Sequence, residues 1–272
     1  MLARTFSIHQ KPTDMPHNKN LPFLFYFALA LCLTACSSDD DNPDNSSSTP
    51  AIANVNSNLL NSNTATHRLE FPKVKGGSSL VLVHEAQLAI PNRNKNTSYE
   101  YGINYSTEWD TGLKSQRWSC YQMYGNNSIQ NVSRYVADTS KGEVQYPFNP
   151  LLGSNYGFNS DPFYRSGYDH GHICPSQDRV STRESNIQTF YLTNMQPQLH
   201  TFNAGVWEKM ETWLRSMNKA SFRDTLYVVK GGTIDSSDKI IRRLGNAHRP
   251  EILFCCHPLQ ERQQLYGHRA VV

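Results

Sequence analysis

The chain has 272 residues, of which 38% are hydrophobic, 18% are charged and 11% are aromatic. This balance is typical of a globular protein and excludes a chain that is disordered along its whole length. Residues 67–272 contain 23 Lys and Arg against 18 Asp and Glu, a net charge of +5 that suits an anionic partner without identifying one. None of the six cysteines belongs to a CxxC pair, so no zinc site is indicated.

The N-terminal residues predict an export signal. Residues 21–33 form an apolar run that follows Lys19; its 13 residues are too few to span a bilayer but fit the core of a signal peptide. A buried or membrane-anchoring helix is the alternative. Residues 33–36 read Leu-Thr-Ala-Cys, which resembles a bacterial lipoprotein box. We therefore predict a lipoprotein signal peptide over residues 1–35 and lipidation of Cys36. The lipid would attach the exported protein to the bacterial cell envelope.

The residues after Cys36 predict a tether. Residues 36–66 are rich in Ser, Asn and Asp and contain few large apolar groups, which predicts disorder. The acidic run directly after Cys36 resembles the sorting signals of surface lipoproteins, so we expect the lipid to sit in the outer membrane or at the cell surface. The folded domain is then predicted over residues 67–272.

The first part of this domain contains several predicted strands and one predicted helix start. Short apolar or alternating runs predict strands at residues 80–83, 101–105, 118–124 and 226–229, and a weaker strand-like run covers 190–192. The Gly-, Asn- and Pro-rich residues 147–162 predict a long surface loop. Ser181 and Glu184 have the spacing of a capping box, which predicts that a short helix begins there.

Two cysteines are a candidate disulfide. Cys120 falls on a predicted strand, and Cys174 lies close after two histidines that the motifs below include. Exported proteins keep disulfides, so a bond between Cys120 and Cys174 would pin the strand to that segment.

The clearest predicted helix begins just after residue 203. Its apolar residues recur at helical spacing: Val206, Trp207, Met210, Leu214 and Met217. Asn203 and Glu211 are eight residues apart, which on a helix is an offset of less than a quarter turn. We therefore expect both side chains to face the same pocket.

Three short motifs follow one another in the middle of the chain. They are Asp-His-Gly-His at residues 169–172, Asn-Met-Gln-Pro-Gln at 194–198 and Asn-x3-Trp-x3-Glu at 203–211. Together they resemble the DNA/RNA non-specific endonuclease family, whose signature is Asp-Arg-Gly-His, then Asn-x-x-Pro-Gln, then Asn-x3-Trp-x3-Glu. The resemblance covers residues 117–234. It implies an α+β fold with a mostly antiparallel central sheet, packed helices and a ββα-metal active site.

The resemblance implies hydrolysis of phosphodiester bonds in DNA and RNA. That reaction needs a base that deprotonates water and a cation that neutralises charge on the leaving oxygen. His172 takes the position of the family's general base, and a neutral imidazole can accept a proton near pH 7. Asn203 takes the position of the single direct protein ligand of a magnesium or manganese ion. An ion that keeps most of its waters in this way is typical of magnesium.

The resemblance also assigns supporting roles. Glu211 corresponds to the acidic residue that holds metal-bound water, and Arg215 to an arginine that meets phosphate. An i,i+4 salt bridge between the two is the alternative for Arg215. Asp169 is expected to orient its segment, and Asn194 to tie the site together through side-chain hydrogen bonds.

The sequence departs from the family pattern in two places. His170 stands where the family has an arginine, and the loss of a charge-assisted contact would weaken transition-state stabilisation by about 1–3 kcal/mol. His170 and His172 as a metal-binding pair are the alternative. Residues 246–272 differ from the strand with which the family completes its sheet. Our hypothesis is a truncated or frameshifted end, which would leave a core strand missing.

Three functions fit these observations. The first is a magnesium-dependent endonuclease without strong sequence preference, anchored to the membrane by its lipid alone. The second is a catalytically weak surface lipoprotein that binds nucleic acid, which predicts salt-sensitive affinity without turnover. The third is a phosphodiesterase or phosphatase acting on a small substrate with the same metal site.

Overall fold

The computed structural model describes residues 4–9, 57–90, 98–125, 127–235, 240–244, 247–250 and 252–257. All of them belong to one compact unit. Cys36, most of the predicted signal peptide and most of the predicted tether lie outside the described residues. Within the described parts, we find no helix with the length and apolar character needed to cross a membrane.

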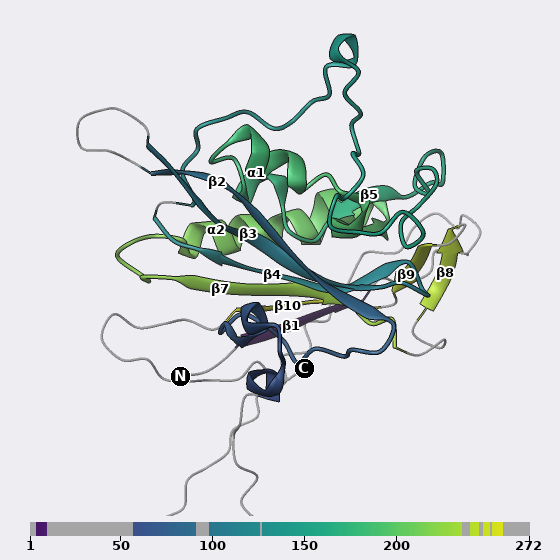
Figure 1. Ribbon diagram of the computed structural model, residues 1–272, viewed down its shortest axis with the longest axis horizontal. Coiled ribbons are helices and arrows are strands. Elements are labelled where there is room, and N and C mark those ends of the chain that lie inside the picture. Colours follow the sequence, from purple (N-terminus) through teal and green to yellow (C-terminus); the bar gives the residue numbers. More distant parts are fainter. Residues whose placement is uncertain are drawn as a thin grey trace, which may run out of the picture. The chain divides into compact units, whose positions relative to one another are not determined.

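A six-stranded sheet forms the centre of the fold (Figure 1). Its strands pair antiparallel in the order β1-β10-β7-β4-β3-β2. The bounds are β1 Arg4–His9, β2 Ser79–Ile90, β3 Ser98–Asp110, β4 Ser115–Met123, β7 Leu226–Gly232 and β10 Ile252–His257. All four predicted strands are present, and β2 and β3 are much longer than predicted. The antiparallel sheet with few helices confirms the α+β class.

The sequence predicted that a core strand is missing at the C-terminal end of the chain. This prediction is wrong, because β10 occupies that place in the sheet. Residues Leu253 to Cys256 pair with Gly232 to Val229, so the C-terminal segment does add a strand beside β7. β1 pairs with the other edge of β10 and lies within the predicted signal peptide, so signal cleavage would remove that edge strand. Two further strands, β8 Ile240–Leu244 and β9 Ala247–Pro250, pair with each other. The hypothesis that residues 246–272 are a truncated or frameshifted end stays a prediction.

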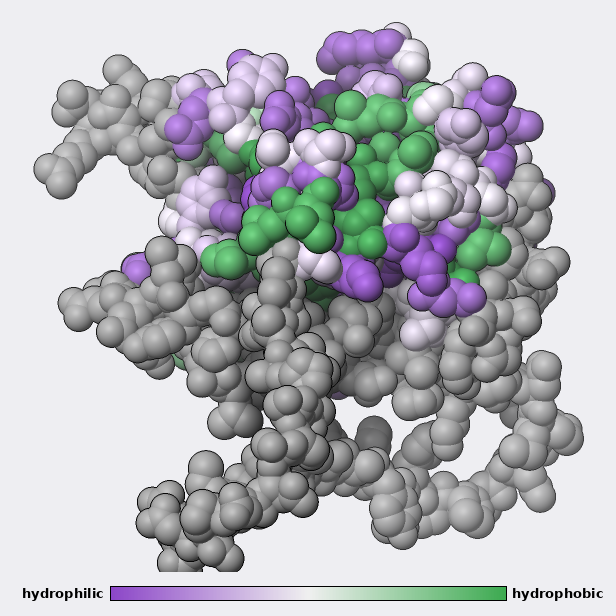
Figure 2. All heavy atoms as spheres, turned by 60° about the horizontal axis from the view of Figure 1, so that its bottom comes forward, coloured by the Kyte–Doolittle hydropathy of each residue, from purple (hydrophilic) through white to green (hydrophobic). Residues whose placement is uncertain are grey.

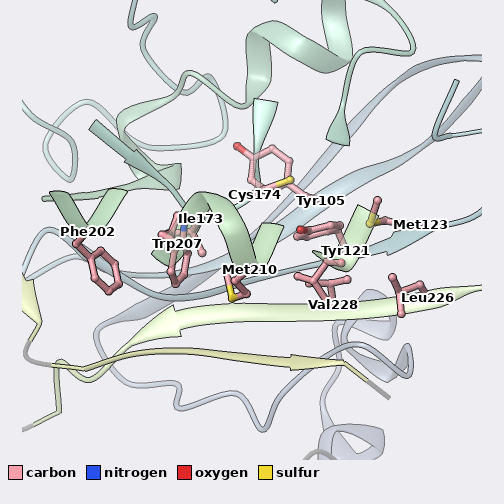
Figure 3. Close-up of a cluster of buried hydrophobic side chains, with 11 residues drawn as sticks. Tyr105, Tyr121, Met123, Ile173, Cys174, Phe202, Trp207, Met210, Leu226 and Val228 are labelled. Carbon is pink, nitrogen blue, oxygen red and sulfur yellow. The ribbon is translucent and has the colours of Figure 1, made fainter. Parts of the chain in front are cut away.

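One face of the sheet is covered by helices α1 Arg183–Gln188 and α2 Glu208–Met217, which Figure 1 shows on the same side. Alternate residues of β4 and β7 pack against α2. The buried cluster includes Tyr121, Val228, Trp207, Met210 and Leu214 (Figure 3). Burial of such large side chains is the main favourable contribution to folding. α2 is thereby fixed against the centre of the sheet.

The start of this helix differs from the prediction. Phe202–Trp207 is a π-helical turn that leads into α2, with a kink at Gly205 (φ −111°, ψ −107°). Trp207 and the apolar residues after it pack inward as predicted, whereas Val206 is exposed. The wider turn changes the angular position of residues before Trp207, which is why helical spacing misplaced Val206.

The predicted disulfide is not formed, because the two cysteines lie on opposite faces of the sheet. Cys120 packs with Phe71, Trp118 and Val229 on the face away from α2. Cys174 belongs to the cluster on the α2 face. Both thiols are free and buried, with β4 itself between them. Sequence position alone could not show on which face each side chain lies.

The helix start at α1 is one residue later than predicted. Thr182 is the N-cap, and its side chain and that of Ser185 form the capping box. Ser181 and Glu184 instead accept hydrogen bonds from the backbone of β2, from Ala89 (2.7 Å) and Gln87 (3.0 Å). The predicted box residues therefore join α1 to the outermost strand of the sheet.

The segment after α1 is not the predicted strand. Leu192–Asn194 is a 3₁₀ turn, and the strand β6 begins after it at Met195–Gln198, paired with β5 Asp169–His172. Residues 147–162 contain turns and bends only, as predicted for a loop. Four further 3₁₀ turns are described: Ser57–Leu60, Thr64–His67, Thr139–Lys141 and Ser176–Asp178.

Apolar side chains are also exposed on the surface. Figure 2 shows hydrophobic residues in patches among hydrophilic ones on one face of the molecule. The exposed large residues come from separate segments and include Leu60, Tyr101, Val136, Phe148 and Tyr164. Single exposed apolar residues are normal on soluble proteins, so they do not by themselves mark a partner site.

The cap at α1 generates the first prediction. Thr182→Ala removes the N-cap acceptor and also the hydrogen bond from Thr182 Oγ1 to the Gln87 carbonyl of β2 (2.6 Å). We expect the free energy of unfolding to fall by about 1–2 kcal/mol, measured by urea denaturation. Thr182→Ser keeps the hydroxyl and is the matched control. Equal stability of wild type and Thr182→Ala would contradict the assigned cap.

Candidate active site

The short strands β5 and β6 position the two motif histidines. Antiparallel pairing places His170 and His172 on one face of β5 and Gly171 on the other. A Cβ at Gly171 would lie 2.3 Å from Cδ of Gln198 and 2.7 Å from the backbone oxygen of Gln196. Only glycine fits there, because backbone atoms cannot give way as a flexible side chain can.

The site is a pocket of about 380 Å³ between β5 and α2. It brings together five of the predicted site residues: His170, His172, Asn203, Glu211 and Arg215. Asn203 and Glu211 do share a pocket, as their spacing predicted, although a π-helical turn lies between them. The elements follow the predicted ββα order. β5 carries the histidines, β6 pairs with it, and the helical segment that ends in α2 carries the oxygen-bearing side chains.

His172 lines this pocket and has one ring nitrogen without a hydrogen-bond partner among the described residues. Its Nδ1 lies 3.1 Å from the backbone oxygen of His170, so Nδ1 carries the proton and donates. Nε2 is buried and has no hydrogen-bond partner within the described protein. Burial, and then the nearby charge of Arg134, lower the pKa of His172 to about 3. His172 is therefore neutral with an unshared electron pair on Nε2, the form that accepts a proton.

Asp169 fixes the orientation of Asn203. The Asn203 amide nitrogen donates to Oδ2 of Asp169 at 3.0 Å. The same carboxylate oxygen lies 2.9 Å from Nδ1 of His200. With its nitrogen committed to Asp169, Asn203 is left with an amide oxygen that can serve as a ligand. This bond joins β5 to the π-helical turn, and the orienting role of Asp169 for its segment stays a prediction.

Glu211 lies between two basic residues. Its Oε1 accepts from Lys230 Nζ at 3.1 Å, and its Oε2 lies 3.9 Å from Arg215. Burial raises the pKa of Glu211, and the Lys230 ammonium opposes that rise. Arg215 has a closer partner than Glu211, because its Nη1 donates to Oδ1 of buried Asp178 at 3.1 Å. The predicted i,i+4 pair is thus the weaker of the two contacts of Arg215.

His170 is partly buried and is held in place by aromatic rings and a carboxylate. Its ring stacks on Tyr146 with centroids 3.9 Å apart, and Phe163 packs at 4.9 Å. His170 Nε2 lies 2.8 Å from Oδ2 of Asp161. Although burial favours the neutral acid, the hydrogen bonds from His170 and the Phe163 backbone hold the pKa of Asp161 below its usual range. An ionised carboxylate only accepts, so His170 donates through Nε2.

Arg134 lines the same pocket and was not among the predicted site residues. Its guanidinium lies 4.8 Å from the centroid of Phe190, whose ring also packs edge-on against His172 (5.0 Å). The chain near Arg134 is docked by backbone bonds of Asn131 and Val132 to Val180. No local motif marks Arg134, because tertiary docking of an irregular segment brings it to the pocket.

Asn194 was also predicted as a site residue. It is fully buried and does not line the pocket. Its side-chain oxygen accepts from the Cys174 amide (2.9 Å) and Ser119 Oγ (3.1 Å). Its nitrogen donates to the carbonyls of Cys174 (2.8 Å) and Thr189 (2.9 Å). Asn194 therefore ties β4 to the end of β5 and the turn after α1, the connecting role expected of it.

The donor set fits a hard cation that keeps most of its water. In the described residues, no three His, Cys, Asp or Glu side chains cluster to bind a metal. Among the side chains that line the pocket, Asn203 offers an amide oxygen and Glu208 and Glu211 offer carboxylate oxygens; Asn203 and Glu211 are the two that belong to the sequence motif. A magnesium ion binds in this way, with few direct protein ligands and several waters, whereas zinc sites take three or four protein ligands.

The lowered pKa of His172 predicts how stability depends on pH. Its folded pKa of about 3 lies below the value of 6.5 in the unfolded chain, so the unfolded chain binds more protons between these values. The contribution of neutral His172 is present above pH 6.5 and is lost as the pH falls toward 3. Between pH 6 and 4, wild type should therefore lose stability more steeply than His172→Gln, by up to about 1.4 kcal/mol per pH unit. Urea unfolding at each pH measures this, and parallel curves would contradict it.

Comparison with known proteins gives consistent matches. A model of the DNA/RNA non-specific endonuclease family matches residues 84–256. A nuclease of Nostoc sp. is 46% identical over 132 residues, 48% of this chain and 43% of that protein. The mitochondrial nuclease EXOG of Xenopus laevis is 28% identical over 131 residues, 47% of this chain and 34% of that protein. Each match spans less than half of the curated relative's length.

A solved structure is also similar. The crystal structure of the EndoG/EndoGI complex aligns with 54% of this chain and 61% of its own chain, at 22% identity and a TM-score of 0.43. The family match covers more than half of this chain and contains every residue of the pocket. The chain belongs to the DNA/RNA non-specific endonuclease family.

Proposed function

We propose that this protein is a magnesium-dependent endonuclease that hydrolyses phosphodiester bonds in DNA and RNA without strong sequence preference. One observation carries the proposal. His172, whose buried Nε2 has no hydrogen-bond partner among the described residues, lines the same pocket as Asn203, Glu211 and two arginines. A base, hard oxygen ligands and positive charge are the groups that this reaction needs.

His172 acts as the base that takes a proton from the attacking water. Its Nδ1–H bond to the His170 carbonyl keeps Nε2 free for that proton and stabilises the ring once both nitrogens are protonated. The lowered pKa keeps the ring neutral at physiological pH, although it also limits the strength of the base. Binding of an anionic phosphate beside the ring favours the protonated form and raises this strength.

The cationic side of the pocket binds the phosphate. Asn203 and Glu211 would hold the magnesium ion, the first through its amide oxygen and the second through water around the ion. When bound, the ion supplies positive charge at the leaving oxygen. Arg134 and Arg215 line the pocket with guanidinium groups that fit phosphate oxygens. Since His170 is committed to Asp161, Arg134 supplies the charge that an arginine at position 170 would have brought.

Weak sequence preference follows from what the pocket offers. Its charged groups recognise phosphate, which is the same in every nucleotide, and phosphate contacts carry no sequence information. We also propose that export and lipidation of Cys36 place the enzyme at the bacterial cell surface, where polynucleotides are available. The basis is the sequence of residues 21–36, which lie outside the described part of the structure.

The base assignment gives a direct test. The full chain should cleave plasmid DNA and RNA with magnesium and lose this activity with chelator. His172→Ala should reduce the cleavage rate by about 10²- to 10⁴-fold, because proton transfer to Nε2 is removed. His67→Ala is the matched control, since His67 lies outside the pocket and its ring bonds the Asn61 carbonyl. Circular dichroism confirms that each variant is folded.

The other two functions predict different results in this assay. Salt-sensitive binding of DNA by folded, magnesium-loaded protein without cleavage would favour a nucleic-acid-binding lipoprotein. Turnover of small phosphoesters with polynucleotides left intact would favour a phosphodiesterase or phosphatase.

Arg134 gives a second test. Arg134→Ala should lower kcat/KM for DNA by about 10- to 100-fold, the loss of one charge-assisted phosphate contact. Arg183→Ala is the matched control, because Arg183 pairs with Glu143 (2.6 Å) and does not line the site. Steady-state cleavage of a fluorescent oligonucleotide measures both variants, and equal rates for the two would exclude a phosphate contact at Arg134.

A further inference from the structure

Lys230 is a fully buried lysine in the central strand β7. Strand alternation puts it on the same face as Leu226 and Val228, which fill the core beneath α2. A buried charge is costly unless it is paired, and a buried ion pair is frequently no more stable than apolar residues of the same size. An apolar residue would serve the core at least as well, so packing alone does not explain Lys230.

The ammonium of Lys230 is held in one place. Its Nζ donates to Oε1 of Glu211 at 3.1 Å. It also lies 5.4 Å from the ring centroid of Trp207 and 5.6 Å from that of Tyr121. Figure 3 shows these two rings on the same side of β7. Cation–π attraction is strongest in such a desolvated setting. The charge is therefore fixed by one carboxylate and two aromatic rings.

This contact determines which oxygen of Glu211 the pocket can use. Oε1 is occupied by Lys230, which leaves Oε2 as the oxygen available to the pocket. Arg215 lies 3.9 Å from Oε2, but its closer partner is Asp178 at 3.1 Å. The closest basic partner of Glu211 is thus Lys230 in β7. Oε2 has no ion-pair contact as close as the one that Lys230 makes with Oε1.

The same aromatic ring connects Lys230 to the strand that carries the base. Trp207 Nε1 donates to the backbone oxygen of His172 at 3.2 Å, while the face of its ring packs near the Lys230 ammonium. Lys230 therefore contacts the element that supplies Glu211 and the ring that supports His172. Both contacts are made from a central strand, the most rigid kind of support for a site.

We propose that Lys230 is a positioning residue that binds Oε1 of Glu211 and so presents Oε2 to the water around the pocket's magnesium ion. The inference rests on the proposed function and adds a residue to it. Lys230 touches neither substrate nor the ion. Its effect on metal affinity is exerted through Glu211.

A double-mutant cycle tests this. Lys230→Met, Glu211→Gln and the double variant are made in the full chain, and magnesium affinity is measured by isothermal titration calorimetry alongside DNA cleavage. Lys230→Met should weaken magnesium binding and cleavage each by about 10- to 100-fold, the usual effect of removing a residue that orients a metal-site group. In the Glu211→Gln background, the same change should cause less than about threefold further loss, because the group through which Lys230 acts is absent.

Val228→Ala is the matched control. It removes a neighbouring core side chain from the same face of β7, so it lowers the melting temperature without touching Glu211. Its magnesium affinity should equal that of wild type. If Lys230→Met does not fold, Lys230→Gln removes the charge while keeping a polar side chain, and the same losses are expected.

The outcomes separate the two proposals. Wild-type magnesium affinity in a folded Lys230 variant overturns the positioning role, and so does an equal loss in both Glu211 backgrounds, while wild-type cleavage leaves the endonuclease proposal standing. Absence of magnesium-dependent cleavage by the wild-type chain overturns the proposed function and the positioning role with it.

Discussion

The four hydrogen bonds of the Asn194 side chain hold the site on the sheet. An amide side chain can make four hydrogen bonds, and Asn194 makes all of them: two with Cys174, one with Ser119 and one with Thr189. Each partner is buried, where an unpaired polar group would cost about 1–3 kcal/mol. The positions of the strand that carries His172, the turn after α1 and β4 are therefore coupled, and the central sheet holds the elements of the pocket in place.

The acidic and the basic side chains around the pocket make different kinds of contact. Three acidic side chains at or beside the site have a defined partner: Asp169 bonds Asn203, Asp161 bonds His170, and Glu211 bonds Lys230. The arginines remain on the pocket wall. These guanidinium groups are the basis of the proposed phosphate contacts, while the three carboxylates hold Asn203, His170 and Lys230. In the proposed function, Arg134 comes from a different segment and takes the place of the arginine that the family has at position 170.

Errors in the sequence-based predictions have two physical origins. Spacing located the helix of Trp207 and Glu211 but not Val206, because a π-helical turn precedes α2. The capping box predicted at Ser181 begins one residue later, because the Ser181 hydroxyl accepts a hydrogen bond from the Ala89 amide of β2. In each case a non-local contact or a local irregularity overrode a pattern that only neighbouring residues define.

The sequence by itself determined the family, the antiparallel α+β fold and most of the pocket, because short motifs fix the order of the site's elements and alternation marks the strands. Only the tertiary structure decided which residues from distant parts of the chain contact one another. It placed Cys120 and Cys174 on opposite faces of the sheet, added Arg134 to the pocket and buried Lys230 behind Glu211. Those contacts join residues distant in the chain, and which distant residues meet depends on sheet order and packing, which no local spacing encodes.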